Sequence, residues 1–291
     1  MNKIYSIAGL NVKLSGEDTL QKIIRLPGFK IFEIENKETL TIDIHIYTDR
    51  NMDNVYRQNI NFIHRFKILD IQHSFSISKE GYLYEMYHRD GRKIAGILHD
   101  TRSDDVFISS CTCDMYLKYI IWVAFTVSAI KKKVIPVHAS SIVKKSKAVL
   151  FLGESGTGKS THTRLWLQHI ENCYLLNDDS PLLCVKDNNI FVCGSPWSGK
   201  VHCYRQAMLP LKAIVRLTQC SENKISHRDN LTAIGAVHPS FPPFLAYDES
   251  FSEKVIQIID KIVKTTPIYS LECRPDRQAA EIASAMIYQL G

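Results

Sequence analysis

The feature that most constrains this chain is a glycine-rich loop at residues 153–161. Its sequence, Gly-Glu-Ser-Gly-Thr-Gly-Lys-Ser-Thr, contains the pattern G-x-x-x-x-G-K-[ST] in full. Five apolar residues (148–152) come directly before it, and a helical pattern follows. A strand that leads through such a loop into a helix can bind phosphate, because backbone N–H groups and the positive end of the helix both point at the anion.

Each part of the loop has an expected role in binding ATP. Gly153, Gly156 and Gly158 allow torsions and close approaches that a side chain would block. Lys159 is expected to reach the β- and γ-phosphates, and the Ser160 hydroxyl to bind Mg²⁺. The expected nucleotide-binding set also includes the other loop residues Ser155, Thr157 and Thr161. The alternative is a glycine-rich turn without a ligand, and the flanking strand and helix patterns favour the nucleotide site.

Two adjacent aspartates follow the loop at the distance of one short helix. Asp178 and Asp179 stand at the end of the apolar run 173–176, and Asp178 is 19 residues after Lys159. Carboxylates at a strand end beside a triphosphate suit Mg²⁺ binding and proton transfer. The alternative is a solvated turn that caps the strand, but the spacing from the loop favours a functional role.

A histidine lies upstream of the loop, in the strand-like segment 134–143. This segment is expected to form a hairpin, through residues 144–147, with the strand that enters the loop. Such a hairpin would carry His138 back over the phosphate site. A lone histidine in a strand is also explained as a core residue, so both interpretations stay open.

The loop, the aspartate pair and His138, which stands fifteen residues before Gly153, together resemble the superfamily of HPr kinase/phosphorylase and ATP-dependent phosphoenolpyruvate carboxykinase. His-Ala-Ser at 138–140 is similar to the His-x-Ser of the carboxykinases. The match covers about residues 134–200. The chain is far shorter than a carboxykinase and lacks the HPr kinase signature after the aspartates. It therefore looks most like a divergent HPr-kinase-type protein, a group that includes kinases found beside modified-peptide gene clusters.

The resemblance implies an ATP- and Mg²⁺-dependent kinase that phosphorylates a hydroxyl, the serine of a peptide or small protein. It implies that Asp178 is the base, that His138 orients it or contacts the metal, and that Lys159 binds phosphate. Ser160 and Asp179 would bind Mg²⁺, although the roles of the two aspartates could be reversed. The alternatives are a small-molecule hydroxyl kinase, a carboxykinase and a nucleotide-binding module without catalysis. The length of the chain argues against a carboxykinase. The retained lysine, serine and aspartates argue against a module without catalysis.

Three basic residues are candidates for contact with the acceptor or the transferred phosphate. Lys200 ends the turn Ser-Pro-Trp-Ser-Gly-Lys, Arg205 follows it, and Arg164 lies one turn into the helix after the loop. Cationic clamps recur in phosphoryl-transfer sites. The alternatives are a tight connection anchored by Trp197 and, for Arg164, a side chain that faces solvent.

The composition is that of an ordinary globular protein. Its 291 residues are 45% hydrophobic and 23% charged, which suits one large or two small domains. A net charge of +6 without a concentrated basic tract makes nucleic acid an unexpected partner. No signal-peptide pattern or membrane-spanning stretch is found, so we expect a cytoplasmic protein without a membrane partner. The eight cysteines, without a C-x-x-C pair, are expected to be reduced and to be mostly small core residues. A homo-oligomer is possible, but no pattern specifies one.

The fold class that we predict is α/β. Residues 1–113 are expected to form a β-rich, antiparallel accessory domain that could dock a substrate. Residues 114–291 are expected to form a P-loop kinase domain with a mostly β core and flanking helices, and the resemblance implies the HPr kinase/phosphoenolpyruvate carboxykinase type. Clean alternation predicts a strand at 40–47. Helices are expected at 114–132, 251–264 and 276–289.

Overall fold

The computed structural model describes residues 1–35, 39–49, 60–68, 70–111, 113–199 and 201–289. The chain divides into two compact units. The first contains residues 1–132 and 246–251, and the second contains 133–245 and 252–291. This division differs from the boundary expected at residue 113, because the helix that begins at Asp114 belongs to the first unit. Within the described residues, no helix is both long enough and apolar enough to cross a membrane.

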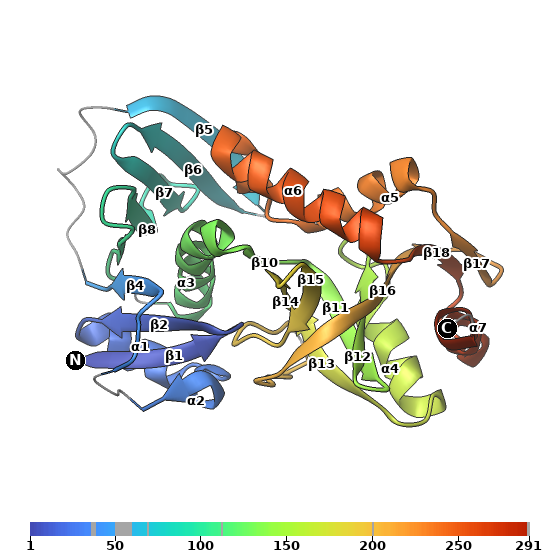
Figure 1. The fold of residues 1–291 in the computed structure, drawn as a ribbon. Helices are drawn as coiled ribbons and strands as arrows, with labels where there is room; N and C mark the ends of the chain where they lie inside the picture. Colours follow the sequence, from blue (N-terminus) through green and yellow to red (C-terminus); the bar gives the residue numbers. More distant parts are fainter. Residues whose placement is uncertain (36–38, 50–59, 69, 112, 200, 290–291) are drawn as a thin grey trace. The chain divides into compact units, whose positions relative to one another are not determined.

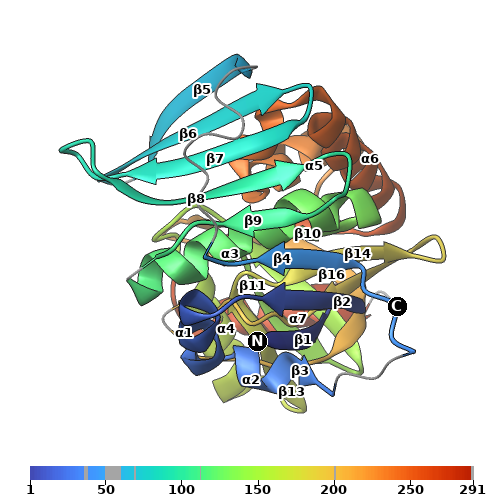
Figure 2. The same cartoon turned by 90° about the vertical axis from the view of Figure 1, so that its left-hand side faces the viewer.

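The first unit is built on a nine-stranded sheet with the order β3-β1-β2-β4-β9-β8-β7-β6-β5 (Figures 1 and 2). Its strands are β1 (Asn2–Ile7), β2 (Leu10–Ser15), β3 (Glu33–Ile34), β4 (Ile44–Tyr47), β5 (Ile60–Ile68), β6 (Ile71–Ser78), β7 (Gly81–Tyr87), β8 (Lys93–Asp100) and β9 (Val106–Ile108). The sheet is mixed, not purely antiparallel as expected, because β4 runs parallel to both β2 and β9. A parallel pair needs a crossover connection, and α1 (Asp18–Arg25) and α2 (Phe29–Phe32) lie in the connection from β2 to β4.

The alternating segment at 40–47 is only partly a strand. β4 begins at Ile44, and Ile44 and Ile46 are buried as the alternation predicts. Leu40 and Ile42 precede the strand and are only half-buried. The alternation therefore identified the buried face correctly but extended the strand too far.

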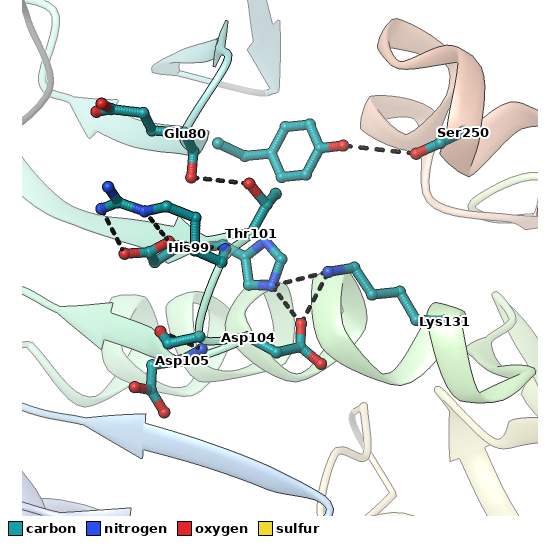
Figure 3. A network of polar contacts seen from close by, with 11 residues as sticks. Glu80, His99, Thr101, Asp104, Asp105, Lys131 and Ser250 are labelled. Atoms are coloured by element: carbon teal, nitrogen blue, oxygen red, sulfur yellow. Dashed lines mark hydrogen bonds and ion pairs between the residues drawn. The ribbon is translucent and has the colours of Figure 1, made fainter.

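Helix α3 (Asp114–Ala129) packs on β8, β9 and β4, and a short 3-10 turn (Ile130–Lys132) continues it. The turn is fixed to the sheet by a polar network around Asp104 (Figure 3). Lys131 Nζ donates to Asp104 Oδ1 at 2.8 Å, and His99 Nε2 lies 2.8 Å from the same oxygen. Burial lowers the pKa of His99, so the neutral imidazole donates its Nε2–H to the carboxylate. These contacts explain why the helix expected at 114–132 belongs to the first unit.

The second unit has a sheet with the order β10-β14-β15-β16-β12-β11-β13, and β18 and β17 continue it beside β16 (Figure 1). Its strands are β10 (Val134–Pro136), β11 (Ala139–Lys144), β12 (Lys147–Leu152), β13 (Cys173–Asp179), β14 (Leu182–Lys186), β15 (Asn189–Cys193), β16 (Met208–Gln219), β17 (Lys224–His227) and β18 (Ile268–Cys273). β16 runs parallel to β12 and β18, whereas β11 pairs antiparallel with β12 and β13. The sheets and their flanking helices confirm a mixed α/β protein.

The helices of this part of the chain are α4 (Lys159–His169), α5 (Asn230–Val237), α6 (Glu249–Thr265) and α7 (Arg277–Gln289), with 3-10 turns at His238–Ser240 and Pro243–Tyr247. Helix α4 packs on β11, β12 and β13, and α7 packs beside α4. Together they bury a core that includes Phe151, Trp166, Val215, Leu271 and Ile287. This core fixes the strand that enters the glycine-rich loop and the helix that leaves it.

The hairpin expected before the loop is confirmed. β11 and β12 are antiparallel neighbours, with Ala139 opposite Leu152. The segment expected as one strand at 134–143 is two strands, because Val137 and His138 separate β10 from β11 and β10 pairs with β14 instead. The break places His138 at the start of β11, outside the ladder.

We expect stability to fall on acidification because of His162 on α4. This residue is buried, its Nε2 accepts a hydrogen bond from Trp166 Nε1 at 3.1 Å, and burial lowers its pKa from 6.5 to about 4. The unfolded state therefore binds more protons below about pH 6.5. Stability that is fully present above this pH is lost as the pH falls towards 4, by about 2 kcal/mol between pH 7 and pH 5.

Urea unfolding at pH 7 and pH 5 measures this loss. The free energy of unfolding should differ less between pH 7 and pH 5 in His162→Gln than in the wild type, by about 2 kcal/mol. His169→Gln, on the exposed side of the same helix, should retain the wild-type difference. An unchanged pH dependence in His162→Gln would contradict the assignment.

Candidate functional site

The candidate site lies where three neighbouring strands of the second unit meet at one edge of the sheet. β12 ends at Leu152, directly before the glycine-rich loop, and β13 ends at Asp179. β11 lies between them, and its first residue, Ala139, is opposite both Leu152 and Asp179. His138 precedes Ala139 in the chain. Antiparallel pairing therefore brings the loop, the aspartates and the histidine to the same edge.

The loop has the backbone that a phosphate cradle requires. Gly158, directly before α4, has φ of 100°, and Gly156 has φ of 85°, a conformation that L residues with side chains rarely adopt. A Cβ atom on Gly153 would lie 2.4 Å from Thr157 Oγ1, so this glycine permits the loop to fold closely on itself. The glycines identified from the sequence stand where backbone geometry needs them.

Lys159 curls back over this loop. Its Nζ donates to the carbonyl oxygens of Gly153 at 2.8 Å and Glu154 at 3.0 Å. Burial lowers the pKa of this lysine, and the nearby Asp179 and Asp178 carboxylates oppose that effect. The ammonium group is therefore held inside the loop with little water around it.

Asp178 is joined to the loop helix through Ser160. The Ser160 hydroxyl lies 3.0 Å from both Asp178 carboxylate oxygens, and Asp178 is only 3% exposed. A serine oxygen and a carboxylate at this separation are hard oxygen donors of the kind that Mg²⁺ prefers. In the described part of the chain, no group of three or more His, Cys, Asp or Glu side chains is arranged to hold a metal ion. Mg²⁺ sites that also use substrate phosphates need only one or two carboxylates.

Asp179 has a different environment from its neighbour. Its side chain is 54% exposed, and Oδ1 lies 3.5 Å from His138 Nε2. Its backbone has φ of 98°, which is uncommon for any residue other than glycine. Asp178 thus faces the loop helix, and Asp179 faces outward with the histidine.

His138 is anchored by its backbone, because its N–H donates to Ser240 O at 2.7 Å. Burial lowers the pKa of its imidazole, and the positive charge of Lys159 lowers it further, while Asp179 opposes both effects. The neutral ring beside a carboxylate can pass or orient a proton near pH 7. The structure brings His138 to the aspartates, and its role stays a prediction.

Arg216 is a further basic residue at this edge of the sheet. It lies on β16 opposite Leu152, the last residue before the loop. Its side chain is 17% exposed, Nη1 donates to Ala236 O at 3.2 Å, and Nη2 lies 3.8 Å from Glu154 Oε1. Its charge contributes to lowering the pKa of both Lys159 and His138. The available sequence signal was an arginine inside the apolar strand segment 213–217.

A cavity of about 820 Å³ opens beside the loop. Helix α4 contributes Arg164 and His162, and the ends of β16 and β18 contribute residues that the sequence does not single out. The loop is tied to this wall by Gln219, whose Nε2 donates to Gly156 O at 3.1 Å. The lining includes Gly156, Thr157, Gly158, Thr161, Arg164, Gln219, Cys220, Cys273 and Arg274.

The remaining basic candidates are placed differently. Lys200 lies outside the described residues. Arg205 donates from Nε to Leu175 O at 2.8 Å, and its guanidinium group lies 5.0 Å from the ring centroid of Tyr174. These contacts place Arg205 along β13, three residues before Asp178, and not at the acid pair. A substrate role for either residue stays a prediction.

No protein-family model and no curated protein sequence matches this chain. Among solved structures, 43 chains match. One of them is the structure of the Hpr(Ser) kinase/phosphatase from Coxiella burnetii, with 11% sequence identity and a TM-score of 0.31. The match covers 53% of this chain and 95% of that chain. A similarity at this level assigns neither a family nor an activity.

Proposed function

We propose that this protein is an ATP- and Mg²⁺-dependent phosphotransferase that phosphorylates a hydroxyl group. The contact between Ser160 and Asp178, next to Lys159 in the glycine-rich loop, carries the proposal. It combines a serine hydroxyl, a nearly buried carboxylate and a buried ammonium group at the start of a helix. These are the groups that hold a metal–triphosphate in P-loop enzymes.

The residues fit Mg²⁺-ATP by shape as well as by chemistry. At Gly156 and Gly158 a side chain would meet no atom within 4 Å, so open space lies directly beside the loop backbone. The adjacent cavity of about 820 Å³ is large enough for a nucleoside. When bound, Mg²⁺-ATP supplies the phosphoryl group and neutralises part of its charge. Among the described residues, Lys159 and Arg216 are cations that can stabilise phosphate charge at this edge.

We assign different roles to the two aspartates. Asp178, nearly buried against Ser160, is the Mg²⁺ ligand. Asp179, exposed and 3.5 Å from His138, accepts the proton of the acceptor hydroxyl. This assignment reverses the roles that the family resemblance implies, and it rests on which carboxylate contacts the serine of the loop.

The acceptor that we propose is a serine of a peptide or small protein. Because more than half of the Asp179 side chain is exposed, a serine carried on a polypeptide can approach it without entering a deep pocket. A small-molecule hydroxyl kinase would share the same nucleotide site, so the acceptor needs a direct test.

The test incubates the protein with ATP, Mg²⁺ and either serine-containing peptides or small hydroxyl metabolites, followed by mass spectrometry. We expect phosphate on a peptide serine, and phosphoryl transfer about 100- to 10,000-fold slower with Asp179→Asn. Phosphate only on a metabolite would overturn the peptide acceptor and leave the kinase intact. Phosphoenolpyruvate formed from oxaloacetate would overturn both the peptide acceptor and the proposal of a hydroxyl kinase. If the protein bound ATP but transferred no phosphate to any acceptor, it would be a nucleotide-binding module without catalysis.

A further inference from the structure

The loop that follows β15 packs against the acid pair. This loop, which the structure describes at residues 194–199 and 201–207, is closed at its base by a hydrogen bond from Gly194 N to Ala207 O at 3.0 Å. Ser195, Trp197 and Ser198 are buried. Loops of this length with joined ends and side chains packed inside are frequently functional.

The interior of this loop is organised by Asn177, the residue directly before Asp178. Its side chain is fully buried, and Nδ2 donates to Trp197 O at 3.0 Å and lies 3.3 Å from Ser195 O. Its Oδ1 accepts from Ser180 N at 3.1 Å. One amide therefore joins the end of β13 to two carbonyl groups of the loop.

The loop in turn holds the backbone of the aspartates. Gly199 N donates to Asp178 O at 2.8 Å, and Ser198 Oγ lies 3.0 Å from the same oxygen. Asp179 forms an isolated antiparallel bridge with Ser198. Asp179 has the positive φ described above, and strained backbone of this kind persists only where surrounding contacts hold it.

Because Gly199 has no side chain, it leaves room for the side chain of Asp179. A Cβ atom at this position would lie 2.9 Å from Asp179 Cβ and 3.3 Å from its Cγ. Contact at 2.9 Å forces one of the two groups to move. Any side chain at this position would therefore shift the Asp179 side chain or the loop backbone that lies against it.

We propose that Asn177 and Gly199 are positioning residues that fix the Asp179 carboxylate for proton transfer, acting through the loop at 194–207. This inference rests on the proposed phosphotransferase function. It explains why a fully buried amide stands beside two carboxylates: each hydrogen bond that it makes holds the loop or the end of β13, and neither group of the amide reaches the phosphate loop. Displacing a reacting group by about 1 Å can lower a rate roughly 100-fold.

The first test compares Gly199→Ala with Gly235→Ala, a glycine in α5 around which a Cβ atom meets nothing within 4 Å. With the protein and Mg²⁺-ATP, Gly199→Ala should lower the kcat of ATP turnover about 10- to 100-fold. The Kd for a fluorescent ATP analogue should change less than about 3-fold, because the nucleotide loop is untouched. Gly235→Ala should match the wild type in both. A kcat within about 3-fold of the wild type in Gly199→Ala would overturn the inference.

The second test does not depend on turnover. In the wild type, the Trp197 and Gly199 amides should exchange with deuterium slowly for a loop, because Trp197 N donates to Ser195 Oγ within the loop and Gly199 N donates to Asp178 O of β13. Asn177→Ala should accelerate this exchange at least about 10-fold, whereas Asn189→Ala, which removes an exposed amide at the β14–β15 turn, should not. Rapid exchange in the wild type would overturn the loop's role. If the wild type bound no ATP, the proposed function would fail, and the exchange result would still decide whether the loop holds the Asp179 backbone.

Discussion

Lys159→Ala should lower the affinity for Mg²⁺-ATP about 100-fold or more, because it removes a charge that would be buried against the phosphates. The ammonium group already lies inside the loop, 2.8 Å from Gly153 O and 3.0 Å from Glu154 O. When a phosphate replaces these carbonyl groups, its attraction to the buried ammonium group is screened little, because little solvent surrounds the lysine. Thermal unfolding with and without Mg²⁺-ATP, together with titration of a fluorescent ATP analogue, measures the loss.

The same substitution should not destabilise the protein without ATP. Burial lowers the pKa of Lys159, so holding this charge in the fold carries a free-energy cost that alanine removes. We therefore expect an unchanged or raised Tm together with lost binding, a combination typical of residues kept for function. Lys147→Ala, at the exposed start of β12, is the matched control and should bind ATP normally. Normal binding by a folded Lys159→Ala variant would refute the phosphate site.

The parts of the fold that the sequence predicted are those that depend on near neighbours. The hairpin before the loop, the loop itself and helix α4 are contiguous, and each is specified by local apolar alternation, by glycines or by helical periodicity. Helix α3 and the C-terminal helices were predicted for the same reason. Their boundaries differ from the expected ones by only a few residues.

The parts that the sequence could not predict depend on contacts between distant segments. β4 pairs with β2 and β9 in parallel, and alternation within one strand does not identify its neighbours. Residues 246–251 return to the first unit, so no single boundary in the sequence separates the two units. Arg216 and Gln219 reach the site because β16 lies beside β12, a pairing between residues more than 50 positions apart in the sequence.

The different environments of Asp178 and Asp179 have the same origin. Successive side chains of a strand point to opposite faces, so two adjacent carboxylates cannot share one environment. The sequence therefore predicts that the two aspartates have different environments. It does not identify which of them lies on the face that α4 covers. The packing of α4 on β13 turns Asp178 towards Ser160 and leaves Asp179 exposed.

Replacing the two aspartates one at a time should separate metal binding from proton transfer. Asp178→Asn removes one negative charge next to Ser160 and should raise the Mg²⁺ concentration needed for binding of an ATP analogue about 10-fold or more. Asp179→Asn should leave this requirement within about 3-fold of the wild type but lower phosphoryl transfer about 100- to 10,000-fold, because an amide cannot accept the hydroxyl proton. Titration of the analogue at several Mg²⁺ concentrations measures the first effect, and single-turnover transfer measures the second.

Asp187→Asn is the matched control for both substitutions. Asp187 lies in the turn between β14 and β15 with φ of 48°, a conformation that asparagine tolerates well, so its charge can be removed without strain. This variant should show wild-type Mg²⁺ dependence and transfer. If instead Asp179→Asn raised the Mg²⁺ requirement and Asp178→Asn did not, the two roles would be those that the family resemblance implies. The contact between Ser160 and Asp178 would then be a feature of the nucleotide-free protein that Mg²⁺-ATP rearranges.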